Sequence, residues 1–223
     1  MYRKLAIIFA AALVAACASS GKTEGQKQLQ DLTSEINKAA KRLEAVRAAI
    51  TTTMAEHDQI VNNKDGDLIG HYKKFSKGLD KIEEEREELQ EQAQKMREAA
   101  KPYFDRWKAD ATKFTNPEMR KRSEERLEQT RQRYEEVKKY GDEVRTAYDA
   151  MMATLRDHRL FWASDLNKGS AEALRKDRPK LEQQSQKVIE GIDKVIDWTK
   201  KFNEAVAMRT QPTPEESGEG ASN

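Results

Sequence analysis

The sequence predicts an all-α protein, an elongated antiparallel four-helix bundle with coiled-coil-like packing. Aliphatic residues recur in alternating steps of three and four, charged residues fill the positions between them, and only five prolines and ten glycines interrupt the 223 residues. Four long amphipathic segments joined by short turns pack most simply in an up-down-up-down arrangement. Helices of about 37 to 48 residues would be roughly 55 to 70 Å long. Rods of this shape are typical of spacers, scaffolds and binding surfaces.

The first two segments follow a heptad pattern on either side of a polar turn. The first occupies residues 29–60, and the polar run 62–67 ends it. The second occupies residues 68–114. Because its register continues through Pro102, we expect a kinked helix at that proline and not two separate helices.

Cap residues mark the boundaries of the last two segments. Asn116 followed by Pro117 predicts the start of a third helix over residues 117–162, with Gly141 at one of its core positions. Residues 166–170 form the next turn, with Ser170 as the predicted cap. The fourth segment occupies residues 174–206 and restarts or kinks near Pro179. Residues 209–223 form a polar tail that we expect to be disordered.

The N-terminus has the features of a lipoprotein signal peptide. Arg3 and Lys4 precede an apolar run over residues 5–14, and two alanines precede Cys17, the one cysteine of the chain. About a dozen apolar residues are too few to span a membrane, so the alternative is an ordinary cleaved signal peptide. We expect a signal peptide over residues 1–16, a tether over 17–25 lipidated at Cys17, and the helical bundle over 26–208.

The expected location is the outer membrane, with the protein facing the periplasm. Ala18 and Ser19 follow the cysteine, whereas an aspartate there is the usual inner-membrane retention signal in enteric-type bacteria. The acyl chains on Cys17 would hold the protein at the membrane almost permanently, because each buried methylene adds about 0.8 kcal/mol of membrane affinity. The membrane, which the protein would contact through this lipid anchor, is thus the first expected partner.

The charge balance argues against nucleic-acid binding. The whole chain carries 41 Lys and Arg against 39 Asp and Glu, and removal of Arg3 and Lys4 with the signal peptide leaves equal numbers of each sign. A strongly basic surface, which nucleic-acid binding requires, is therefore not expected. With Cys17 acylated, the mature chain also has no thiol for a disulfide, a metal or redox chemistry.

The turn between the second and third segments has the composition of a lipid interface. These two segments are about ten residues longer than the outer two, so their turn would lie beyond them, at the end of the bundle that carries both termini. Aromatic and basic residues alternate there. The alternative is that the aromatic residues are core positions and the charges form a solvated face. The candidate membrane-contact residues are Trp107, Phe114, Phe104 and Arg120.

The three histidines, His57, His71 and His158, fall near the opposite end of the bundle. A metal site is conceivable because acidic residues lie beside them. A di-metal bundle needs Glu-x-x-His pairs that project inward, however, and the sequence has none. We expect hydrogen-bonded histidines in a polar core layer, no metal and no cofactor.

Signatures of catalysis are missing from the sequence. It has no Gly-x-Ser-x-Gly elbow, no His-Glu-x-x-His and no Cys-x-x-Cys. Arg86 falls at a core position, where we expect it to set the helix register by pairing with an acid on a neighbouring helix. Long regular bundles without convergent polar clusters offer no concave site, so no enzymatic activity is expected.

Several short motifs resemble a known family. They are Gly66-Asp67-Leu68 with Tyr72, Phe104-Asp105-Arg106-Trp107, Ser123 with Leu127, Thr130 and Tyr134, and Leu166-Asn167 before Leu174. The pattern is similar to that of the uncharacterised bacterial lipoproteins grouped as domain of unknown function 2959, from about Ile36 to Val206. The resemblance implies a helical lipoprotein of the cell envelope. It implies no known activity and no functional residues.

Two classes of function follow from these observations. The first is a structural or interaction scaffold, anchored in the outer membrane, that binds an envelope protein or the cell wall. The second is a membrane-acting protein whose hairpin tip contacts or remodels lipid. Self-association stays open, because heptad faces also support pairing between bundles.

Overall fold

A computed structural model describes residues 23–62 and 66–210, with side chains described as far as residue 205. These residues are almost entirely helical, which confirms the all-α prediction. The four long helices are α1 (Glu24–Asn62), α2 (Leu68–Ala111), α3 (Pro117–Ser164) and α5 (Arg178–Thr210). Between the last two lie the short helix α4 (Lys168–Ala173) and the 3-10 helix η1 (Leu174–Asp177). Glu24 and Thr210 each lie within two residues of the predicted ends of the bundle.

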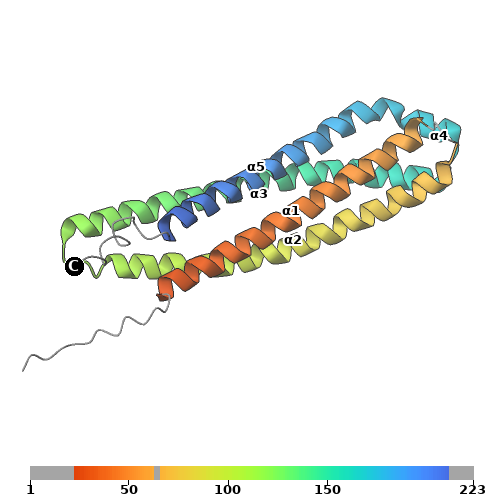
Figure 1. The fold of residues 1–223 in the computed structure, drawn as a ribbon. Coiled ribbons are helices and arrows are strands. Elements are labelled where there is room, and N and C mark those ends of the chain that lie inside the picture. The colour runs from red at the N-terminus through yellow and green to blue at the C-terminus, as the bar shows by residue number, and fades with distance from the viewer. Residues whose placement is uncertain (1–22, 63–65, 211–223) are drawn as a thin grey trace, which may run out of the picture.

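The helices form an elongated antiparallel bundle (Figure 1). The closest pairs are α1 with α2 and α3 with α5, while α1 also contacts α5 and α2 contacts α3. Each long helix therefore has two antiparallel neighbours, as in an up-down-up-down bundle. The longest helix, α3, has 48 residues and is about 72 Å long at 1.5 Å per residue.

Polar side chains cap the N-termini of α2 and α3 at the boundaries that the sequence predicts. The Asp67 side chain accepts a hydrogen bond of 2.9 Å from the backbone N–H of Gly70, and Gly66 beside it adopts a φ of 82°. Asn116 accepts from the backbone N–H groups of Glu118 and Met119, with Pro117 as the first residue of α3. These side chains satisfy backbone donors that have no partner within the helix.

The predicted cap at Ser170 is wrong in its position. Asn167 caps α4: its side chain accepts from the Ser170 N–H at 3.0 Å, and the Ser170 hydroxyl accepts from the Asn167 N–H at 3.0 Å. This reciprocal pair is a capping box, in which Asn167 is the cap and Ser170 is the third residue of the helix. Serine is common at both positions, so the residue type alone does not distinguish them. The predicted restart near Pro179 is confirmed by the start of α5, and α2 passes Pro102 as one helix, as expected.

The core consists of two groups of buried side chains, one toward each end of the rod. The distal cluster, at the α1–α2 turn and beyond, includes Phe75, Leu79, Met151, Leu155, Trp162 and Leu181. The proximal cluster, near the α2–α3 turn, includes Leu32, Ile36, Tyr103, Phe104, Tyr134 and Val137. Gly141, which was predicted at a core position, is instead exposed. Phe114 is exposed because it lies in the turn after α2 has ended, which excludes the alternative that it is a core residue.

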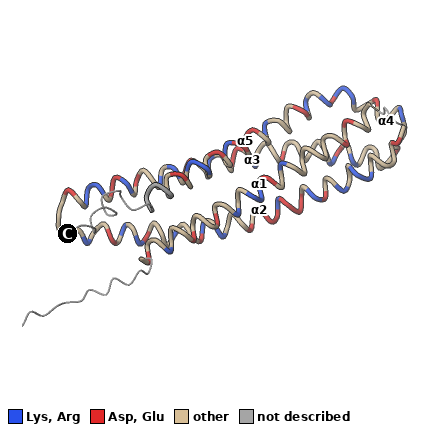
Figure 2. Tube along the Cα trace, viewed as in Figure 1, with Lys and Arg blue, Asp and Glu red and all other residues tan. Residues whose placement is uncertain are grey.

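Charged residues of both signs are interspersed along the long helices (Figure 2). Several of them join neighbouring helices. Arg47 on α1 pairs with Asp193 on α5 at 2.7 Å, and Arg156 on α3 pairs with Glu83 on α2 at 2.8 Å. As predicted, Arg86 has an acidic partner on a neighbouring helix, Asp149 at 3.6 Å. Such exposed pairs contribute little stability but favour one helix register over others.

In the part of the chain that the structure describes, no helix is both long and apolar enough to cross a membrane. The predicted signal peptide, Cys17, most of the tether and the predicted tail beyond Thr210 lie outside the described residues.

Candidate functional site

The hairpin of α2 and α3 projects beyond the start of α1 and the end of α5 (Figure 1). We call residues 106–126, which form this projection and its base, the tip. The start of α1 lies beside the tip, because Thr23 and Gly25 line the same shallow depression as Trp107 and Asp110. The predicted geometry is therefore confirmed: the turn between α2 and α3 lies at the end of the rod where α1 begins.

The four candidate membrane-contact residues occupy different environments. Phe104 is buried, with ring centroids 5.3 Å from Tyr103 and 5.6 Å from Tyr134. It is thus a core residue and is unavailable for membrane contact in this fold. Trp107 is half-buried, and its indole N–H donates to the Ser123 hydroxyl at 3.1 Å.

Phe114 and Arg120 lie at the surface of the tip. Phe114 is 41% exposed, and nearby Met119 is 45% exposed. The guanidinium of Arg120 donates to the backbone carbonyl of Thr112, so it closes the turn between α2 and α3. The tip holds seven basic and four acidic side chains, which leaves it net positive beside its two exposed apolar groups.

The large apolar side chains that are exposed in the described residues gather at the two ends of the rod. Phe114 and Met119 lie at the tip. Ile69 at the start of α2, and Leu160 and Phe161 in the last turns of α3, are 63%, 68% and 45% exposed at the distal end. We call these last three residues the distal apolar group. Exposed apolar side chains that gather in one region are typical of interaction surfaces.

A buried pair of histidines lies inside the distal end. His57 on α1 is 1% exposed and His158 on α3 is 5% exposed, and the His57 Nε2 lies 2.9 Å from the His158 Nδ1. Phe75 and Trp162 pack against the His57 ring at centroid distances of 5.7 and 5.0 Å. One imidazole donates and the other accepts, so the accepting imidazole is neutral. The predicted hydrogen-bonded core layer is confirmed for this pair.

Burial controls the protonation of these histidines. It lowers the pKa of His57 to about 3, with further lowering from His158 and Arg178. Burial also lowers the pKa of His158, although Asp177 and Asp157 act in the opposite direction. The cause is the cost of placing a charge in an apolar interior.

The third histidine belongs to a separate contact. The His71 Nδ1 lies 2.6 Å from a carboxylate oxygen of Glu56. Within residues 23–62 and 66–210, no group of three or more His, Cys, Asp or Glu side chains is arranged to hold a metal ion.

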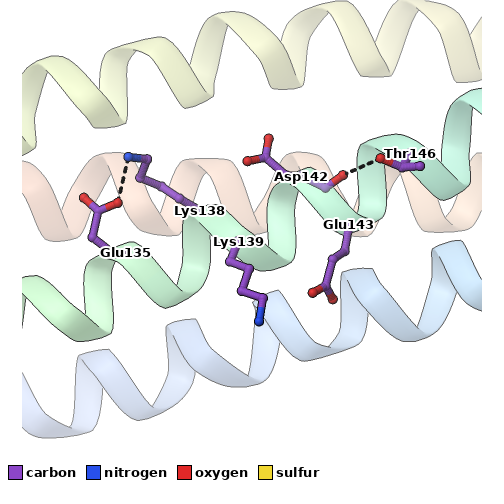
Figure 3. A pocket seen from close by; sticks show the side chains of 6 residues that line it. All are labelled: Glu135, Lys138, Lys139, Asp142, Glu143 and Thr146. Carbon is purple, nitrogen blue, oxygen red and sulfur yellow. Dashed lines mark hydrogen bonds and ion pairs between the residues drawn. The ribbon is translucent and has the colours of Figure 1, made fainter.

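Two depressions lie near the middle of the rod. One is a shallow part of the α3 surface, where Lys138 and Asp142 point toward α2 while Lys139 and Glu143 point toward α5 (Figure 3). Several of its polar groups already have partners on α3 itself, such as Lys138, which forms an ion pair of 2.8 Å with Glu135. It is a solvated helix face and offers no enclosure.

The second is a deeper cleft of about 410 Å³ lined by all four long helices. Its floor is apolar, and its polar lining includes Arg86, Arg97 and Arg145. We call it the mid-rod cleft. Its volume falls within the range of about 300 to 1,000 Å³ that is usual for small-molecule sites.

Comparison with protein families matches residues 19–206 to a model described as a protein of unknown function, DUF2959. The chain belongs to this family. The match extends further toward the N-terminus than the resemblance read from the sequence motifs, and it covers α1, α2 and α3 in full and α5 as far as residue 206. Comparison with curated proteins and with solved structures gave no match.

Sequence reasoning missed the mid-rod cleft and the distal apolar group. A signal for the cleft was present, because three small residues of the predicted helices line it: Ala39, Ala93 and Gly141. Burial alone distinguishes the distal apolar group from core residues, since Leu160 and Phe161 directly precede the fully buried Trp162 in sequence.

Proposed function

We propose that this DUF2959 protein is a lipid-anchored helical scaffold of the bacterial cell envelope. In this proposal, Cys17 carries the lipid, the outer membrane holds the tip end of the rod, and the distal end engages an envelope protein or the cell wall. The proposal includes no catalytic step. A second candidate function is contact of the tip with the membrane itself.

The single observation that supports the scaffold best is the distribution of exposed apolar groups. The faces along the rod are charged, whereas the large exposed apolar side chains of the described residues lie at its two ends. A spacer needs contacts at its ends and a solvated middle. The distal apolar group also lies on helix ends held together across the rod, since the Tyr72 hydroxyl on α2 donates to the Arg159 carbonyl on α3 at 3.4 Å.

The position of the anchor supports the orientation. Glu24, the first residue of α1, follows Cys17 by seven positions, and a chain of that length reaches at most about 25 Å. A lipid on Cys17 would therefore hold the tip end near the membrane and the distal apolar group about 70 Å away, at 1.5 Å per helical residue.

Photocrosslinking of the full chain in a Gram-negative host tests both candidate functions. Benzoylphenylalanine replaces Phe161 at the distal end, Phe114 at the tip, or Lys139 on the exposed middle of α3 as a matched control. The scaffold predicts a discrete protein adduct or a cell-wall adduct from position 161 and none from position 139. An adduct to phospholipid from position 114, with none from position 161, would instead support the membrane-acting function.

The anchor has its own test. Cys17→Ser should move the full chain out of the outer-membrane fraction or block its maturation, because no acyl chain can attach to serine. Retention of the variant in that fraction at the wild-type level contradicts the lipid-anchor proposal. A Ser19→Ala variant keeps the cysteine and serves as the control.

A further inference from the structure

The inner side of the tip is uncovered, because the two outer helices do not reach as far as the turn of the hairpin (Figure 1). Gly191 on α5 packs against α3, since an added methyl group there would lie 2.5 Å from the Cγ2 of Val144. α5 ends 19 positions after Gly191, at Thr210. Glu125 lies 19 positions before Val144. Because the two helices are antiparallel, α5 ends level with Glu125, about 12 Å short of the first residue of α3.

A shallow depression of about 280 Å³ lies on this uncovered side. Leu29, Tyr103 and Trp107 form its apolar part, and Arg106 and Arg126 bring two cations to it. Trp107 is half-buried there, whereas Arg126 is exposed. Because the depression is open to solvent, it suits a segment of chain that lies across it better than an enclosed small molecule.

The tip has three more cations than acids. Asp110 is shared by two of these cations, Arg106 at 3.3 Å and Lys113 at 2.7 Å. Two further pairs within the tip are 3.9 Å long, which is too long for a hydrogen bond. The tip cations that form no ion pair among the described residues are Lys108, Arg120 and Arg126. An anionic partner can therefore approach these three without displacing an acid.

The chain carries an anionic segment of matching charge directly after α5. Residues 211–223 lie outside the described part of the structure, and they contain three glutamates and no Lys, Arg or His. We call residues 215–219, which hold all three glutamates, the acidic segment. It begins five positions after Thr210 and ends nine positions after it, so its glutamates reach about 17 to 30 Å from the end of α5. The tip extends only about 12 Å beyond that end, and it therefore lies within reach.

We propose that the acidic segment docks on the tip of its own chain. Its glutamates pair with Arg126 in the depression and with Arg120 at the turn, and the segment crosses the depression beside Trp107. Exposed ion pairs are weak individually, but the segment is tethered beside the tip, so its effective concentration there is on the order of millimolar. The contact is autoinhibitory, because any other anionic partner of the tip must displace it. The proposal is independent of the scaffold function.

Fluorine NMR of the full chain carrying Cys17→Ser and Ser217→Cys tests this contact. The three tryptophans are replaced by 5-fluorotryptophan, and a nitroxide on the introduced thiol broadens the fluorine signals that lie near the acidic segment. We expect strong broadening of the Trp107 signal in the tip. The Trp162 signal should stay sharp, because this side chain is buried at the far end of the rod.

Charge variants distinguish docking from mere tethering. Changing the three glutamates of the acidic segment to glutamine should reduce the broadening of Trp107 at least threefold, and about 0.5 M NaCl should reduce it similarly, since salt screens exposed charges. The matched control changes three exposed glutamates on α5 to glutamine and should keep the broadening. These control positions are Glu182, Glu190 and Glu204. Equal broadening with and without the glutamates of the acidic segment overturns the proposal.

A substitution in the tip and a mixing experiment locate the contact. Arg126→Gln should reduce the broadening of Trp107 at least twofold, whereas Arg133→Gln, at an exposed position on the same helix, should leave it unchanged. Broadening that passes from a nitroxide-labelled chain to a fluorinated chain without nitroxide would assign the tip to a second copy and overturn the intrachain contact. An unbroadened Trp107 signal in a protein that floats with anionic vesicles would assign the tip to a membrane and would also overturn it.

Discussion

His57 and His158, which are 101 residues apart in the sequence, share a hydrogen bond of 2.9 Å in the interior of the distal end. The pair joins α1 to α3, which are diagonal in the bundle and are not among the closely contacting helix pairs. A neutral imidazole can donate with one ring nitrogen and accept with the other. The pair is therefore a polar connection across the core that requires at least one unprotonated histidine as acceptor.

The buried histidines predict a protein that loses stability in mild acid. The pKa of His57 is about 3 in the folded state, against an ordinary value of 6.5. Below pH 6.5, His57 becomes protonated in the unfolded chain but stays neutral in the folded chain. The stability that the buried neutral histidine contributes is therefore complete above pH 6.5 and is lost as the pH falls toward 3. The free energy of unfolding should fall by about 1 to 3 kcal/mol from pH 7.5 to 5.5.

Urea denaturation at the two pH values measures this change. A double variant, His57→Phe with His158→Leu, should show little fall over the same range, because neither side chain titrates. His71→Gln is the control and should keep the wild-type fall. An unfolding free energy that is equal at pH 7.5 and 5.5 in the wild type would contradict the neutral, buried pair.

The same substitution at two glycines should change stability in opposite directions. A Cβ at Gly141 meets no neighbour, whereas one at Gly78 on α2 would overlap the Oγ1 of Thr53 on α1. Gly141→Ala should stabilise the protein by about 0.5 to 1 kcal/mol, since glycine in a helix interior is entropically unfavourable. Gly78→Ala should destabilise it by about 1 to 3 kcal/mol, because Thr53 is fully buried and cannot move aside.

Urea denaturation followed by helical circular dichroism gives both values under one set of conditions. Two changes of the same sign and similar size would show that helix propensity alone governs these positions, and would contradict the close approach of α1 and α2 at Gly78.

Trp162 should be the most important tryptophan for stability. It is fully buried, and its ring lies 5.4 Å from Phe75 and 5.0 Å from His57. Trp162→Ala should cost about 3 to 5 kcal/mol through the cavity it leaves. Trp198, half-buried and stacked on Phe202 at 5.2 Å, is the matched control and should cost less. Equal losses of unfolding free energy for the two variants would argue against the tight distal cluster.

The tip prediction concerns only its exposed residues. Phe114→Ser with Met119→Ser should leave the melting temperature unchanged, because neither side chain is part of the core. If the tip contacts lipid, the variant of the full Cys17→Ser chain should lose most of its flotation with anionic vesicles. Leu160→Ser at the distal end is the control and should float as the parent does. Wild-type flotation of the Phe114 and Met119 variant would exclude the tip as a lipid contact.

The local features of this fold were accessible from the sequence. The heptad spacing predicted four long helices and the buried face of α1, and Asn116 with Pro117 predicted the start of α3. The prediction was wrong at Ser170, where the backbone partner of each side chain distinguishes a cap from the third residue of a capping box. The heptad spacing continues to Phe114, but this side chain is exposed because no helix lies opposite it beyond the end of the bundle.

The sequence by itself determined the all-α class, the order and approximate ends of the helices, and the faces that turn inward, because helix periodicity and capping depend on neighbours within a few residues. Only the tertiary structure decided which side chains meet at each level of the rod. It joined His57 to His158, buried the Tyr148 hydroxyl without a hydrogen-bond partner among the described residues, and exposed Ile69 and Phe161 at the distal end. The physical reason is that burial depends on the size and position of residues on three other helices, far away in the sequence.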